Sequence, residues 1–99
     1  MTYTAPPPAS APPPRILVID DEPQIRRFLA ISLRAQGYEV AEASDGRSGL
    51  EALATRGADV VVLDVGLPDL SGFEVCRRLR ALPGPQAQVP VIFLTARND

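Results

Sequence analysis

Polar residues end three of the apolar runs in this 99-residue sequence, and their placement predicts a shared site. Asp20 and Asp21 follow the first such run, Asp64 follows another, and Thr95 follows the last. If the runs are neighbouring parallel strands, these side chains meet, because parallel α/β sheets place their sites beyond the carboxyl ends of the strands. Carboxylates in such proximity repel each other, which raises at least one pKa or recruits a cation. Oxygen ligands with room for water favour Mg²⁺ over zinc.

Each of these residues also has a structural interpretation, taken alone. Asp21 could cap a helix, Asp64 could orient its own loop, and Thr95 could cap the start of a further helix. Their joint placement after buried runs favours a common site over three separate structural roles.

Strand and helix patterns alternate along the chain and position these residues. Strand patterns occupy Ile16–Ile19, Tyr38–Glu42, Val60–Leu63 and Val89–Leu94. Helical periodicity fills the three intervals between them, from Pro23 to Gly37, from Gly46 to Gly57 and from Ser71 to Leu82. This order predicts an α/β fold with one parallel sheet and right-handed crossovers. We expect the first, third and fourth strands to be buried on both faces, because they are continuous apolar runs.

Composition and charge limit the classes of function. Six of the eleven prolines lie in residues 1–14, which predicts a disordered tail before a single domain at residues 15–99; a ligand for an SH3-like groove is the alternative for this tail. A net charge of -2 argues against direct nucleic-acid contact. No apolar run reaches the ~20 residues of a membrane span, and the N-terminus lacks signal-peptide features. Cys76 lies in an apolar helical stripe, so we expect a core position rather than a reactive thiol.

Three segments carry a resemblance to a known family. Ile16–Glu22, Val61–Gly72 and Val91–Ala96 together resemble the receiver domain of two-component response regulators. Gln24–Leu29 and Asp64–Pro68 are similar to the KdpE type within its OmpR-like branch. The resemblance covers everything after the tail and implies a flavodoxin-like (CheY-like) parallel sheet with helices on both faces.

The resemblance also implies roles for individual residues. Asp64 would be the phosphoacceptor, taking a phosphoryl group from the phosphohistidine of a sensor histidine kinase. Asp21 would ligate Mg²⁺ directly, Asp20 would help through water, and the backbone carbonyl of Gly66 would complete the protein ligands. Thr95 would donate a hydrogen bond to a phosphoryl oxygen. The family implies a cytoplasmic signalling module that controls transcription, rather than an enzyme.

Two departures from the family pattern qualify this expectation. The chain contains no lysine, whereas the family's fifth strand ends in a lysine that pairs with the phosphoryl group. It also ends at Asp99, before a fourth helix, a fifth strand and a fifth helix. We therefore expect an incomplete sheet of four strands with three helices, weak phosphorylation, and a homodimer or swapped dimer formed through the exposed sheet edge.

Two functions of other classes are alternatives to this one. A non-phosphorylated interaction fragment derived from a receiver remains the alternative. An aspartate-nucleophile phosphatase of the haloacid type is disfavoured, because Gly66 stands where that family needs a second acid.

Overall fold

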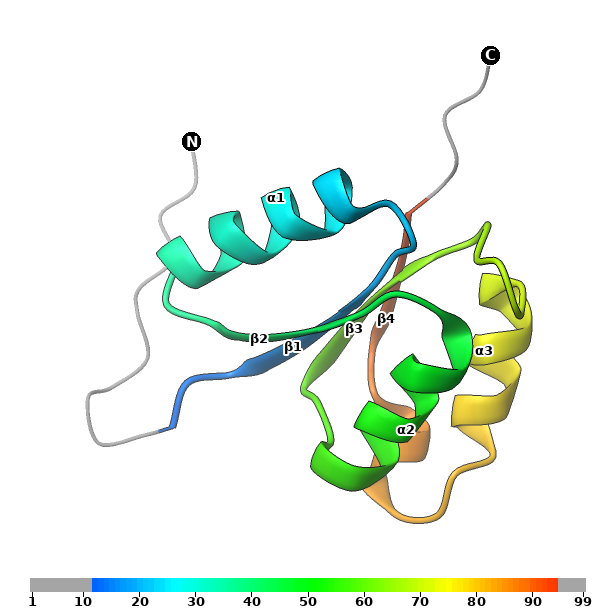
Figure 1. The fold of residues 1–99 in the computed structure, drawn as a ribbon. Helices are drawn as coiled ribbons and strands as arrows, with labels where there is room; N and C mark the ends of the chain where they lie inside the picture. Colours follow the sequence, from blue (N-terminus) through cyan, green and yellow to red (C-terminus); the bar gives the residue numbers. More distant parts are fainter. Residues whose placement is uncertain (1–11, 95–99) are drawn as a thin grey trace.

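Four short strands and three helices make up residues 12–94, the part of the chain that the computed structural model describes (Figure 1). The elements are β1 (Arg15–Ile19), α1 (Pro23–Ala35), β2 (Glu39–Ala43), α2 (Gly46–Arg56), β3 (Val60–Asp64), α3 (Gly72–Arg80), the 3-10 helix η1 (Pro85–Gln88) and β4 (Val91–Leu94). The predicted alternation of strands and helices is confirmed. The predicted disordered tail lies mostly outside the described residues, as does Thr95.

The strands form one parallel sheet in the order β2-β1-β3-β4. In the register of this sheet, Ile19 of β1 pairs with Ala43 of β2 on one side and with Leu63 of β3 on the other. The carboxyl ends of the two central strands are therefore aligned. This alignment brings the residues that follow β1 next to the last residue of β3, as the sequence predicted.

The helices cover both faces of the sheet, with α1 on one face and α2 and α3 on the other (Figure 1). Side chains alternate along β1, so that Val18 packs in the α1 layer while Leu17 and Ile19 pack in the layer of α2 and α3. Both faces of β1 and β3 are thus buried, as their continuous apolar runs predict. Cys76 of α3 is half-buried and packs against the core, again as predicted.

The prediction that β4 is buried on both faces is wrong. Ile92 is 55% exposed, and the other residues of β4 are only partly buried. The reason is the position of the strand, because β4 is an edge of the sheet and no helix of residues 12–94 covers its α1 side. An apolar sequence fixes what a strand could bury, whereas its neighbours decide what it does bury.

The sequence Ser71-Gly72-Phe73-Glu74 has the spacing of a capping box and predicts one at the start of α3, but the structure forms only half of it. The hydroxyl of Ser71 accepts a hydrogen bond from the backbone N–H of Glu74 at 3.1 Å, as the motif requires. The Glu74 carboxylate instead accepts hydrogen bonds from Arg77 and Arg78. These two arginines lower the pKa of Glu74 to about 2. The helix start is thus secured by Ser71, while Glu74 organises the exposed basic face of α3.

Among the described residues, no helix combines the length and the apolar character that crossing a membrane requires.

Candidate functional site: three carboxylates at the ends of the central strands

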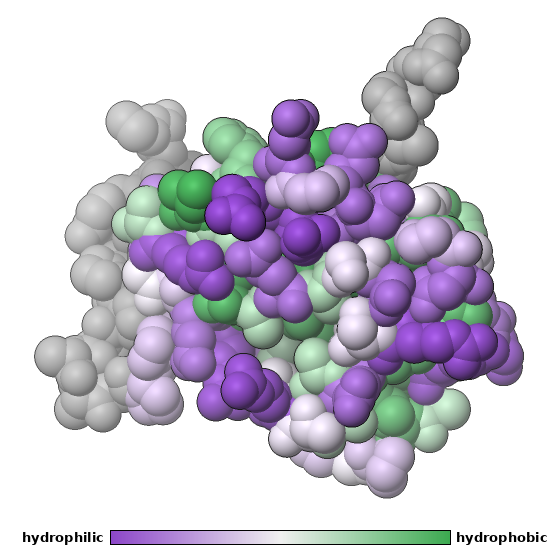
Figure 2. Space-filling model, in the orientation of Figure 1, coloured by the Kyte–Doolittle hydropathy of each residue, from purple (hydrophilic) through white to green (hydrophobic). Residues whose placement is uncertain are grey.

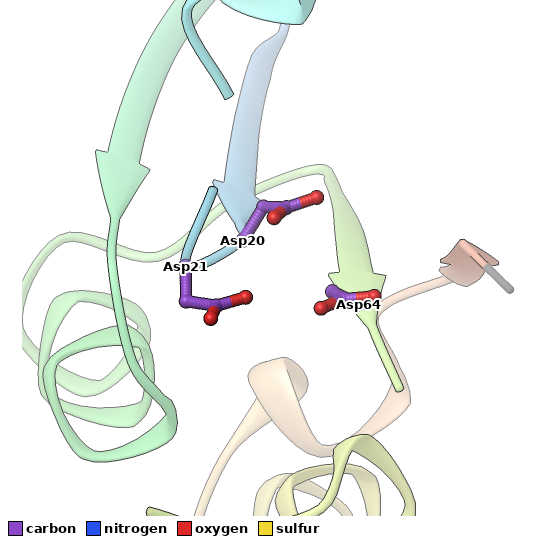
Figure 3. A group of neighbouring side chains, drawn as sticks. All are labelled: Asp20, Asp21 and Asp64. Carbon is purple, nitrogen blue, oxygen red and sulfur yellow. The ribbon is translucent and has the colours of Figure 1, made fainter. Parts of the chain in front are cut away.

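Asp20, Asp21 and Asp64 converge beyond the ends of β1 and β3 (Figure 3). One carboxylate oxygen from each residue lies within 4.8 Å of the corresponding oxygens of the other two. Asp20 is buried, with 3% of its surface exposed, whereas Asp64 is half-buried and Asp21 is exposed. The cluster is therefore closed on the side of the sheet and open to solvent above Asp21.

Three hydrogen bonds hold Asp20 in place. Its own N–H donates to the carbonyl of Ala43 at the end of β2, 3.1 Å away, and its Oδ1 accepts from the N–H of Glu22 at 2.9 Å. The guanidinium of Arg26 on α1 donates to the Asp20 carbonyl oxygen at 2.9 Å and also pairs with Glu42 at 3.2 Å. The turn after β1 is thus tied to α1 and β2.

Burial and mutual repulsion set the electrostatics of the cluster. Desolvation raises the pKa of Asp20, and the charges of Asp21 and Glu22 raise it further. The hydrogen bond from the Glu22 N–H and the positive charge of Arg26 act in the opposite direction and only partly offset the increase. Desolvation likewise raises the pKa of Asp64, and the neighbouring charge of Asp20 contributes next. Carboxylates that resist ionisation in this way gain from a cation between them. An all-oxygen donor set open to water is the kind that Mg²⁺ prefers. The residues present therefore fit that ion.

The loop between β3 and α3 is fixed at both ends around Gly66. Leu67 is buried in the core, and the N–H of Gly72 donates to the carbonyl of Val65 at 2.8 Å. A Cβ at Gly72 would lie 2.5 Å from the carbonyl oxygen of Asp64, so only glycine lets α3 begin this close to β3. Gly66 itself is exposed beside the cluster.

Most of the residues predicted from the sequence have a described position. Asp20, Asp21 and Asp64 come together, and Gly66 follows Asp64 on the same loop. The structural alternative for Asp21 is not supported, since Glu22 is the N-cap residue of α1 and no side chain caps that helix. Thr95 lies outside the described residues, so its predicted place is not observed.

Two supporting residues were missed by sequence reasoning. Arg26 lies opposite the apolar positions of its helical pattern, which indicates a solvent-facing side chain, yet it reaches the Asp20 carbonyl. Asp69 falls within the segment Val61–Gly72 and has no predicted role, yet its carboxylate accepts hydrogen bonds from the N–H groups of Gly46 and Arg47. Neither contact leaves a periodic signal in the sequence, because each joins residues of different elements that are brought together only when the chain folds.

Comparison with known proteins identifies the family of this chain. Residues 16–99 match the family described as "Response regulator receiver domain". The chain belongs to this family. The resemblance drawn from the sequence is thereby confirmed, and the acidic cluster lies in a receiver domain.

Curated relatives of this receiver domain are transcriptional regulators. The transcriptional regulatory protein AfsQ1 of Streptomyces coelicolor is 49% identical over 84 residues, which are 85% of this chain and 36% of that protein. KdpE of Mycobacterium tuberculosis is 51% identical over 84 residues, again 85% of this chain and 35% of that protein. The chain thus spans little more than a third of the length of these relatives.

Solved receiver structures share its fold. The chemotaxis protein CheY4 of Vibrio cholerae is 31% identical with a TM-score of 0.82, covering 89% of this chain and 72% of that one. TrrA of Thermotoga maritima, described in complex with Mg²⁺-BeF, is 38% identical with a TM-score of 0.76, covering 85% and 70%. The expected CheY-like sheet of four parallel strands with three helices is confirmed.

Proposed function

We propose that this receiver domain accepts a phosphoryl group on Asp64 from the phosphohistidine of a sensor histidine kinase, with Mg²⁺, to control a transcriptional response in the cytoplasm. The observation that carries the proposal is the cluster of Asp20, Asp21 and Asp64, whose carboxylate oxygens lie within 4.8 Å of one another. Membership of the receiver family supports the reaction, and the description of AfsQ1 and KdpE as transcriptional regulatory proteins supports the output.

Asp64 acts as the nucleophile in this proposal. A carboxylate oxygen of Asp64 forms a bond to phosphorus as the P–N bond of the phosphohistidine breaks, and the electron pair of that bond stays on the imidazole nitrogen. The product is an acyl phosphate on Asp64. An ionised carboxylate needs no base to remove a proton, which agrees with a chain that contains no histidine. Positioning of the nucleophile and neutralisation of oxygen charge are the main requirements of such a transfer.

Asp20, Asp21 and Gly66 would support the transfer by holding the ion together with Asp64. Asp21 and Asp64 would be direct ligands, Asp20 would act through water, and Gly66 would offer its backbone carbonyl. Bound Mg²⁺ would supply positive charge against the oxygens of the phosphoryl group. Thr95, which follows β4, donates a hydrogen bond to one of these oxygens. The similar protein TrrA is described in complex with Mg²⁺-BeF, which supports the choice of Mg²⁺ as the ion.

The first helix offers a surface for the protein that donates the phosphoryl group. Ile25, Phe28 and Ile31 of α1 are exposed, and Phe28 has 68% of its surface in solvent. Figure 2 shows apolar surface over α1 among hydrophilic residues. Because α1 begins at Pro23, two residues after Asp21, a partner bound to the start of this helix lies beside the acidic cluster. Exposed apolar residues grouped in this way are typical of interaction sites.

A direct test is labelling of the chain by a small phosphodonor such as acetyl phosphate, with and without Mg²⁺. We expect slow labelling, because the chain has no lysine to balance the charge of the phosphoryl group. All of the label should be on Asp64, located by mass spectrometry after reductive trapping. Asp64→Asn should remove it, whereas Asp45→Asn should not. Label that persists in Asp64→Asn would refute the proposal, and absence of any label on the wild type would favour the non-phosphorylated interaction fragment.

A further inference from the structure

The carboxylate of Asp69 joins the loop after β3 to the start of α2. Its Oδ1 accepts a hydrogen bond from the N–H of Gly46 at 2.8 Å, and its Oδ2 accepts from the N–H of Arg47 at 2.9 Å. Oδ1 also accepts from the N–H of Leu70, within its own loop, at 2.9 Å. Gly46 and Arg47 are the first two residues of α2, whose N–H groups have no partner inside the helix. Asp69 therefore satisfies helix donors from a segment 22 or 23 residues away in the sequence.

The charge of Asp69 suits this position. Although partial desolvation opposes the effect, the N–H groups of Gly46, Arg47 and Leu70 hold the pKa of Asp69 below its ordinary value. A negative group at the start of a helix also interacts favourably with the helix dipole. The contact is thus made by an ionised side chain and persists throughout the neutral range of pH.

Asp69 is one of two anchors on the same side of Gly66. Leu67 inserts its side chain into the core next to Gly66, and Asp69 binds α2 two residues later. On the other side of Gly66, Val65 accepts the hydrogen bond from Gly72. The exposed Gly66 is therefore held between the end of β3, where Val65 is bonded to Gly72, and the attachment of Asp69 to the start of α2. Its backbone has little freedom while both attachments persist.

We propose that Asp69 is a positioning residue, which fixes the loop of Asp64 and Gly66 against α2 and so holds the Gly66 carbonyl and the Asp64 carboxylate in place for the divalent cation. This inference rests on the proposed function, since it concerns the metal site on which that function depends. Partners that orient metal ligands without touching the ion affect metal affinity strongly, by roughly 10-fold to 100-fold when they are removed.

Asp45 provides a matched control on the same helix. It is the N-cap residue of α2, and its carboxylate accepts hydrogen bonds from the N–H and the hydroxyl of Ser48 at 2.8 Å and 2.6 Å. Asp45 and Asp69 thus both satisfy donors at the start of α2 by means of a carboxylate. Only Asp69 belongs to the loop that carries Gly66. Loss of either side chain weakens the start of α2, but only the loss of Asp69 also releases the loop that carries Gly66.

The test is a Mg²⁺ titration of the ¹⁵N-labelled 99-residue chain and its variants, followed through the amide resonances of Gly66 and its neighbours. Urea unfolding of each variant identifies conditions under which it is folded, so that the dissociation constant refers to the folded state. We expect Asp69→Ala to raise the dissociation constant for Mg²⁺ by about 10-fold. Asp45→Ala should lower the urea midpoint and leave this constant unchanged. Asp69→Asn keeps one acceptor oxygen and should give an intermediate constant.

Each outcome decides the proposal. A raised constant in Asp69→Ala or, if that variant does not fold, in Asp69→Asn supports it, provided that Asp45→Ala binds Mg²⁺ like the wild type. Equal constants in all of these proteins overturn it and leave the proposed function intact, and so does an increase in Asp45→Ala as large as that in the Asp69 variants. Absence of saturable Mg²⁺ binding by the wild type overturns both the positioning role and the metal site of the proposed function.

Discussion

Gly72 and Asp64 approach each other so closely that a methyl group on Gly72 would lie 2.5 Å from the carbonyl oxygen of Asp64. The same methyl group would also lie 2.8 Å from the Cα of Val65. Both contacts are with backbone atoms, which cannot move aside as the end of a flexible side chain can. The start of α3 and the end of β3 are thus fitted to each other at the residue that we propose to be phosphorylated.

Substitution of this glycine should therefore affect stability and the site together. We expect Gly72→Ala to lower the free energy of unfolding by about 1–3 kcal/mol, the usual cost of overpacking. It should also weaken Mg²⁺ binding, because the shifted backbone carries Asp64. Urea unfolding and a Mg²⁺ titration measure the two effects. Gly66→Ala is the stability control, since no atom lies within 4 Å of its added methyl group. A Gly72→Ala protein as stable as the control would contradict the expectation.

The raised pKa of Asp64 predicts how stability changes with pH when no divalent ion is present. The folded chain keeps a proton on Asp64 to higher pH than the unfolded chain, whose pKa stays near 3.8. The contribution of Asp64 to stability is therefore most favourable below that value and is lost as the pH rises through the raised pKa. Asp64→Asn removes the charge, so its advantage over the wild type should grow as the pH rises.

The size and the reversal of this effect can be measured in one experiment. In EDTA at neutral pH, Asp64→Asn should be more stable than the wild type by about 0.5–2 kcal/mol, the range typical of relieving an unfavourable charge. Addition of Mg²⁺ should stabilise the wild type and not the variant, because only the wild type retains the full ligand set. Thermal unfolding with and without Mg²⁺ measures both. A variant that is less stable than the wild type in EDTA would show that the cluster is not strained.

The exposed side chain of Phe28 predicts a separation between two phosphodonors. Phe28→Ala should reduce the rate of transfer from a cognate histidine kinase by about 10-fold, which corresponds to the roughly 1.4 kcal/mol that a contributing interface residue supplies. The rate from acetyl phosphate should not change, because Phe28 lies on α1 and outside the acidic cluster. Ile92→Ser, on the far edge strand, controls for loss of exposed apolar surface. An equal reduction of the rate with both phosphodonors would mean that Phe28→Ala disturbs the folded domain rather than the contact with the kinase.

The edge strand β4 predicts self-association of this chain. Its outer edge has no partner strand among the described residues, and Ile92 exposes more than half of its surface. An apolar edge with unpaired backbone groups recruits another strand. We expect sedimentation over a concentration series to show a dimer at high concentration, and Ile92→Lys to shift the equilibrium towards monomer. A wild-type chain that stays monomeric at every concentration would refute this prediction.

Much of the fold could be predicted from the sequence, because the strands and helices have local signals. The apolar run from Ile16 to Ile19 specified a buried central strand, and Pro23 marked the start of α1, which begins at that residue. The strand order follows only from the CheY-like fold that the family resemblance implies, since periodicity does not reveal which strands are neighbours. Exposure of Ile92 was not predictable for the same reason, because it depends on what lies beside β4.

The site was predictable only in its acidic residues. Asp20 and Asp64 end apolar runs, and aligned parallel strands bring such positions together. Arg26 and Asp69 act on backbone groups that any residue type could provide, so their contacts leave no trace in the residue pattern. Glu74 shows the converse, because its spacing from Ser71 predicted a reciprocal cap while two arginines took its carboxylate.

The half-buried thiol of Cys76 is a natural chemical probe of the motion of α3. It is the sole thiol in the sequence, and it packs against the core from a helix that begins at Gly72, directly against Asp64. Local opening of α3 exposes this half-buried sulfur more fully, so its rate of labelling by a thiol reagent rises with that opening. Labelling rates measured with and without Mg²⁺ therefore report whether events at the carboxylates reach the middle of α3.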